Sequence, residues 1–168
     1  VLNNKGLAFN MLERYDAAIG CFNKILSFNP KNEHALNNKG VTLENLNKLQ
    51  EALWCYNKAL KSSPQNEIVL NNKGLVLSKL GKHEEAIKCY DFLLKLNPKN
   101  EHALNNKGVA LGEMGEIQES VNYFEKALIL NPKDDIAFYN KIIALGELRK
   151  NTPVPKIKSG IRRKSKRK

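Results

Sequence analysis

The side chains best suited to recognition chemistry are asparagine amides that recur at one fixed spacing. The string Asn-Asn-Lys-Gly begins at Asn3, Asn37, Asn71 and Asn105, and a degraded copy begins at Tyr139, so every interval is 34 residues. An amide both donates and accepts hydrogen bonds, so a row of amides can satisfy the backbone of a bound peptide whatever its sequence. The alternative is that the amides hydrogen-bond to one another. We call these residues the asparagine ladder: Asn3, Asn4, Asn37, Asn38, Asn71, Asn72, Asn105, Asn106 and Asn140.

An apolar row with the same period accompanies the amides. Leu7, Val41, Leu75, Val109 and Ile143 each follow an asparagine of the ladder by three residues. On a helix they project away from the face that packs on the core, where a solvated helix normally carries polar groups. We call this row the apolar ladder. It predicts either a surface that contacts a partner's apolar side chains or packing between adjacent helices.

The other reactive residue types form no catalytic or metal-binding pattern. Cys21, Cys55 and Cys89 are also 34 residues apart, and we expect free thiols because equivalent positions on packed helices are too distant for a disulfide. The three histidines have no companions at zinc-ligand spacing. No Gly-rich phosphate loop and no nucleophile with a supporting base is present. The sequence therefore predicts a non-catalytic protein without a cofactor or metal.

A lysine ladder shares the period. Its members precede the repeated glycine or its replacement: Lys5, Lys39, Lys73, Lys107 and Lys141. The favoured interpretation is that each stem packs at the edge of the core while its ammonium group reaches water. A stripe that binds phosphate is the alternative.

The net charge of +11 on the 168 residues is concentrated at the C-terminal end. Residues 1–148 carry 18 basic and 17 acidic residues, whereas 149–168 carry ten basic and no acidic ones. We expect the tail, 150–168, to be disordered. It either binds nucleic acid or another polyanion non-specifically through counterion release, or only promotes solubility. The candidate polyanion-binding residues are Arg162, Arg163, Lys164, Lys166, Arg167 and Lys168.

Composition also bears on location. No apolar run approaches the roughly 20 residues of a membrane-spanning helix, so we expect no membrane insertion. The N-terminal residues carry no apolar signal core. Three cysteines without a Cys-x-x-Cys motif fit a reducing compartment. We therefore expect a cytoplasmic protein, and the start at Val1 suggests a chain cut from a longer one.

Each 34-residue period predicts two helices. The first is expected over Ala35–Leu46 in the second period, and Asn47 then favours a break, as Gly81 and Gly115 do in the later periods. The second is expected from about Leu49 to Ser62, because Pro64 cannot continue it. Asn66 is the expected N-cap of the next helix.

This pattern resembles the tetratricopeptide repeat family, whose period is 34 residues. In the fourth repeat the motif falls on Leu104, Lys107, Gly108, Leu111, Ser120, Phe124, Ala127 and Pro132. The resemblance extends over about 1–149 and implies an all-α, right-handed α-solenoid of stacked antiparallel helix pairs. The expected repeats are 1–32, 33–66, 67–100 and 101–134, followed by a C-terminal capping helix at 135–149. Its inner face would carry Phe138, Leu145 and Leu148.

The resemblance also implies a function. First helices of this family line a concave groove that holds a segment of a partner protein. Here the groove candidates are Asn4, Asn37, Asn38, Val41, Glu44, Asn45, Asn71, Asn72, Leu75, Ser78, Lys79, Asn105, Asn106, Val109 and Asn140. The groove predicts a protein-interaction scaffold that binds an extended or helical peptide segment.

Two further inferences concern the partner. One subclass of the family clamps chaperone C-terminal carboxylates with cationic groove residues, and here those positions hold Asn37, Val41, Asn71 and Leu75, so we expect no such clamp. The alternatives to a scaffold are a nucleic-acid-associated adaptor acting through the tail and a self-associating structural module. Self-association would use the N-terminal face, where Leu12 and its neighbours are apolar.

Overall fold

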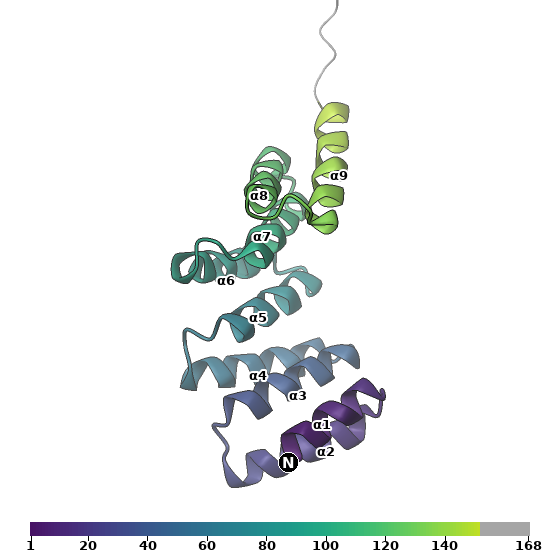
Figure 1. The fold of residues 1–168 in the computed structure, drawn as a ribbon, viewed down its shortest axis with the longest axis vertical. Coiled ribbons are helices and arrows are strands. Elements are labelled where there is room, and N and C mark those ends of the chain that lie inside the picture. Colours follow the sequence, from purple (N-terminus) through teal and green to yellow (C-terminus); the bar gives the residue numbers. More distant parts are fainter. Residues whose placement is uncertain (152–168) are drawn as a thin grey trace, which may run out of the picture.

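The structure is a computed structural model that describes residues 1–151. Over this range the chain forms nine α-helices and no strands, which stack in chain order from α1 at one end to α9 at the other (Figure 1). The helices are α1 (Leu2–Met11), α2 (Tyr15–Phe28), α3 (Glu33–Asn45), α4 (Leu49–Ser62), α5 (Glu67–Lys79), α6 (His83–Leu96), α7 (Glu101–Glu113), α8 (Ile117–Leu130) and α9 (Asp135–Asn151). The predicted all-α repeat fold is confirmed.

The expected disordered tail begins at residue 150, but Lys150 and Asn151 belong to α9, and the rest of the expected tail lies outside the described residues. The same holds for the candidate polyanion-binding side chains Arg162, Arg163, Lys164, Lys166, Arg167 and Lys168.

The helices α3, α5, α7 and α9 each begin at a side-chain cap, whereas α1 begins after Val1 without one. The Oδ1 atom of Asn66 accepts a hydrogen bond from the Val69 backbone N–H at 3.1 Å, as the sequence predicts. Asn32 and Asn100 cap α3 and α7 in the same way at 2.9 Å, and Asp134 caps α9 at 3.0 Å. These caps satisfy backbone donors that a helix start leaves unpaired.

The turn inside each pair requires one residue in the left-handed region. Asn47, Gly81 and Gly115 have φ values of 57°, 72° and 85°, at the breaks expected from the sequence. In the first pair Glu13 takes this conformation, with φ of 57°. Glycine adopts positive φ without strain, whereas a residue with a Cβ is destabilised there.

Within each pair an aromatic ring packs directly on a glycine. The pairs are Phe22 on Gly6, Tyr56 on Gly40, Tyr90 on Gly74 and Phe124 on Gly108. A Cβ added to Gly40 would lie 2.5 Å from a carbon of the fully buried Tyr56 ring. The missing side chain therefore lets the first helix approach the ring of the second.

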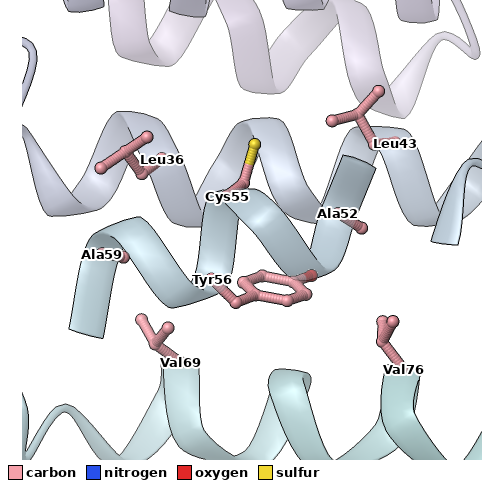
Figure 2. Close-up of a cluster of buried hydrophobic side chains, with 8 residues drawn as sticks. All are labelled: Leu36, Leu43, Ala52, Cys55, Tyr56, Ala59, Val69 and Val76. Atoms are coloured by element: carbon pink, nitrogen blue, oxygen red, sulfur yellow. The ribbon is translucent and has the colours of Figure 1, made fainter. Parts of the chain in front are cut away.

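The buried side chains continue from one pair to the next. Figure 2 shows one cluster, in which Tyr56 on α4 faces Val69 and Val76 on α5. Leu36 on α3 belongs to the same cluster. Because each cluster draws on neighbouring pairs, the core is continuous along the array, as expected for stacked repeats.

First helices approach one another across repeats, whereas second helices do not. Among the described residues, the backbones of α1 and α3, α3 and α5, α5 and α7, and α7 and α9 approach closely, whereas those of consecutive second helices α2, α4, α6 and α8 do not. The array is therefore curved, with the first helices on its inner side.

The two ends of the array expose apolar side chains. On α9, Ala137 and Ala144 are buried, but Phe138 is 58% exposed and Ile142 51% exposed. Phe138 is expected to be buried on the core-facing side of α9, but it is exposed because no second helix covers that side within the described residues, whereas Leu145 packs against the core. At the other end Leu12 is 68% exposed.

Candidate functional site on the inner face of the first helices

The asparagine ladder forms a continuous set of hydrogen bonds along the inner face. The Nδ2 atom of Asn38 donates to Asn3 Oδ1 at 2.9 Å, and that of Asn72 donates to Asn37 Oδ1 at 3.0 Å. The two remaining bonds join Asn106 to Asn71 at 3.0 Å and Asn140 to Asn105 at 3.1 Å. Each bond connects one first helix to the next, so the amides tie the repeats together.

These bonds leave part of each amide unused. A side-chain amide has two N–H donors and an oxygen with two lone pairs, and each ladder bond uses one donor and one lone pair. Asn72, for example, donates to Asn37 and keeps its own Oδ1. Asn4 differs from its equivalents, since it is exposed and Asn3 forms the bond at this end.

The apolar ladder lies beside the amides and is partly open to solvent. Leu7 is 38%, Val109 36% and Ile143 46% exposed. Val41 and Leu75 are half-buried, and Val41 packs against the core cluster around Tyr56. Both alternatives from the sequence therefore apply in part, because these side chains contact the array and still present apolar surface.

One edge of this face is polar. Lys79 Nζ donates to Glu44 Oε1 at 2.6 Å, which pairs adjacent first helices, and the Tyr56 hydroxyl donates to Glu44 Oε2 at 3.3 Å. Burial raises the pKa of Tyr56, and the charge of Glu44 raises it further, so the phenol remains a donor. Asn45 Nδ2 also donates to Asn10 Oδ1, at 3.4 Å. Glu44, Asn45 and Lys79 are therefore partly engaged within the array.

A pocket opens at the C-terminal end of the face. It lies between α7, α8 and α9, with a volume of about 290 Å³. Val109, Gly112 and Ile143 are among its lining residues, together with the ring of Phe124 and the side chain of Ser120. Sequence reasoning missed this pocket, although Gly112 stands where the earlier repeats have Glu44 and Ser78.

The lysine ladder is only partly as expected. The side chain of Lys107 is 9% exposed and its ammonium group contacts Asp91 at 2.5 Å and Tyr123 at 2.7 Å, so it does not project into water. Burial alone would lower the pKa of Lys107, but the hydrogen bonds to Asp91 and Tyr123 outweigh it and raise the pKa. Lys141 pairs with Glu125 at 2.8 Å.

The cysteines are free thiols on second helices. Cys55 and Cys89 are buried, and burial raises the pKa of Cys55 to about 11, so its thiol stays protonated at neutral pH. No group of His, Cys, Asp or Glu side chains in residues 1–151 is arranged to hold a metal ion. Likewise, none of the helices α1 to α9 has the length and hydropathy to cross a membrane.

Helical hairpins with a 34-residue period, stacked into a curved array, define the class of this protein as an α-solenoid. Two family models, both described as tetratricopeptide repeat, match the sequence. One matches residues 1–32, 68–100 and 102–134, and the other matches 21–53. The chain belongs to the tetratricopeptide repeat family. A search of curated proteins found no significant match.

Solved structures share the fold at low identity. The MamA protein is 19% identical with a TM-score of 0.79, and the match covers 88% of this chain and 81% of that one. YrrB, described as a TPR protein with an unusual peptide-binding site, is 21% identical with a TM-score of 0.73, over 89% and 77% of the two chains. The first TPR of Spaghetti (RPAP3), solved with the HSP90 peptide SRMEEVD, is 23% identical with a TM-score of 0.67, over 70% and 93%.

Proposed function

We propose that this protein is a non-catalytic scaffold that binds a segment of a partner protein along the inner face of its first helices. The observation that carries the proposal is the apolar ladder, whose exposed members Leu7, Val109 and Ile143 follow that face from one end to the other. Partly exposed apolar side chains beside hydrogen-bonding amides match both components of an extended or helical peptide. Two of the structural neighbours are peptide-binding TPR proteins by their descriptions, which supports the proposal.

The asparagine ladder has two roles in this proposal. Its inter-repeat bonds hold the first helices at a fixed spacing. The amide donors and acceptors that remain can hydrogen-bond to the amide groups of a peptide backbone. The groove candidates Asn37, Asn71 and Asn105 thus act mainly as acceptors from the next repeat. The residues that discriminate between partners are those that differ between repeats, such as Glu44, Ser78 and Gly112.

We infer that the partner is not an acidic C-terminal peptide of the kind bound by Spaghetti. The positions that would need cations hold Asn37, Val41, Asn71 and Leu75. The nearby cation Lys79 is already paired with Glu44. The peptide SRMEEVD should therefore show no saturable binding to the groove.

The test is a selection of dodecapeptides from a random display library on the full chain, with heparin present to occupy the basic tail. Selected peptides are then made synthetically, and their affinities are measured by fluorescence anisotropy. We expect the double variant Leu75→Ser/Val109→Ser to bind them about tenfold more weakly or worse, because the apolar contacts are lost.

The matched control is Ile129→Ser/Phe92→Ser, which removes two apolar side chains that are 78% and 40% exposed on the second helices. It should bind within about twofold of wild type. Circular dichroism must show that both variants remain folded. Equal losses in the two variants, or full affinity in Leu75→Ser/Val109→Ser, would show that the peptides bind elsewhere and would reject the proposal.

A second candidate function, polyanion binding, is supported by the concentration of charge in 149–168. The variant Arg162→Gln/Arg163→Gln/Lys164→Gln should lower the affinity for single-stranded DNA and reduce its salt dependence, because fewer counterions are released. Unchanged salt dependence would reject a role for these residues.

A further inference from the structure

The pocket at the C-terminal end of the groove exists because of substitutions that occur together in the fourth repeat. Gly112 replaces Glu44 and Ser78 of the earlier repeats, and Phe124 replaces the tyrosine whose hydroxyl contacts Glu44 in the second repeat. The first change removes the side chain of residue 112, and the second removes a ring hydroxyl that in the second repeat reaches the equivalent side chain, Glu44. The resulting space of about 290 Å³ equals roughly ten water molecules at liquid density, enough for one long side chain.

The wall of this pocket contains a hydroxyl group that the fold does not use. Ser120 is 1% exposed, and its Oγ has no hydrogen-bond partner in the described part of the chain. The Oγ lies 3.3 Å from the position that a Cβ on Gly112 would occupy, so it faces the space that the glycine leaves. The equivalent residues Ala18, Ala52 and Ala86 are alanines. Packing at this position therefore does not need the hydroxyl, and a buried polar atom without a partner is destabilising.

Two carboxylates border the same pocket. Glu113 on α7 and Glu147 on α9 both line it, and neither forms an ion pair within residues 1–151. Glu113 is also the last residue of α7, where the helix dipole disfavours a negative charge. Both side chains are exposed, so they are free to turn toward a cation held at the mouth of the pocket, and a cation beside Glu113 would offset the unfavourable helix dipole.

The polar atoms that line the pocket are mostly acceptors. They include the two carboxylates, and Asn140, which also lines the pocket, keeps its Oδ1 acceptor and one N–H donor after the bond to Asn105. The Ser120 hydroxyl can also accept. The apolar part of the wall, with Val109 and Ile143, suits a hydrocarbon stem. A ligand group with several donors, no acceptor, a positive charge and an apolar stem matches this lining.

We propose that this pocket binds an arginine side chain of the partner segment held in the groove. The guanidinium group lies against Glu113 and Glu147 with a further donor toward Ser120, and the stem packs on the apolar wall. Arginine is favoured over lysine because its planar fork offers five donors to oxygens in several directions, whereas an ammonium group offers three. The inference rests on the proposed groove and adds the side-chain chemistry of its ligand.

The test uses the dodecapeptides selected on the full chain. We expect them to share one arginine, and we replace it by citrulline, which keeps the shape without the charge, and by lysine. The citrulline peptide should bind about tenfold or more weakly, and the lysine peptide several-fold more weakly. The protein variant Glu113→Gln/Glu147→Gln should weaken the arginine peptide about tenfold and leave the citrulline peptide unchanged.

Three further variants complete the experiment. Gly112→Ser narrows the pocket with the residue found at Ser78 and should weaken the arginine peptide several-fold. Ser120→Ala restores the alanine of the other repeats, so it should fold normally and cost a few-fold in affinity. Glu84→Gln, on α6, removes one carboxylate outside the pocket and should have no effect.

The outcomes separate this inference from the proposed function. Groove-dependent peptides without a shared arginine, equal affinity for the citrulline or lysine peptide, or full affinity in Glu113→Gln/Glu147→Gln would overturn the arginine pocket alone. A library without any groove-dependent peptide would overturn the groove and the pocket together.

Discussion

Gly81 and Gly20 have equally open surroundings but opposite backbone requirements. A Cβ added to either residue would meet no atom within 4 Å. Gly81 has a φ of 72°, whereas Gly20 lies inside α2. Since packing is the same at both positions, any difference between alanine substitutions there reports the backbone conformation alone.

We therefore expect the two substitutions to change stability in opposite directions. Gly81→Ala should lower the free energy of unfolding by about 1 kcal/mol, because the left-handed conformation disfavours a Cβ. Gly20→Ala should raise it by about 0.5–1 kcal/mol, because alanine loses less backbone entropy in a helix. Urea denaturation followed by circular dichroism gives both values, and changes of the same sign would refute the argument.

The sequence predicted the turns at Asn47, Gly81 and Gly115 because these residue types favour the left-handed region. It did not predict the same conformation at Glu13, because glutamate carries no such preference. The sequence did not predict the pocket beside Gly112 either, because the pocket is formed where side chains of α7, α8 and α9 fail to fill the space between them. Local preference can be read from residue types, whereas empty space depends on packing.

At the level of helices, the hydrogen bonds between first helices depend on the rotation from one repeat to the next. The sequence period is 34, but each ladder bond joins residues 35 apart, such as Asn37 and Asn72. The period showed that the amides recur, and it left open whether they bind each other or a ligand. Only the relative placement of adjacent helices shows that the second asparagine of one repeat donates to the first of the previous one.

A double-mutant cycle measures this link between α3 and α5. We expect Asn37→Ala and Asn72→Ala to show a coupling free energy of about 0.5–1.5 kcal/mol, the usual net value of one hydrogen bond. The control pair Asn37→Ala and Asn106→Ala has no shared bond and should be additive within about 0.5 kcal/mol. Additivity in both cycles would mean that the amide bond contributes nothing to stability.

At the level of the whole molecule, both ends of the array present apolar surface. Phe138 and Ile142 are more than half exposed on α9, and Met11 and Leu12 are 85% and 68% exposed at the other end. Ile142 occupies the place at which the earlier repeats have a glycine under an aromatic ring. Its side chain would collide with a ring placed as in those repeats.

The exposed ends predict self-association at high protein concentration. Ile142→Glu should lower the association constant measured by sedimentation equilibrium, because a charge in the contact opposes burial. The matched control is Ile68→Glu, an isoleucine that is 67% exposed in the middle of the array. A monomer at every concentration, or equal effects of the two variants, would exclude association through this end.

The near-identical ladder bonds, 2.9–3.1 Å in length, imply that the floor of the groove looks the same to a ligand at every repeat. A bound segment that slides by one repeat meets the same amides again, so the ladder can hold a chain without fixing its register. Alignment must come from positions where the periodicity fails, and Glu44, Ser78 and Gly112 are such positions. If the proposed groove binds a partner, these few non-repeating side chains set the position of the bound segment along the array.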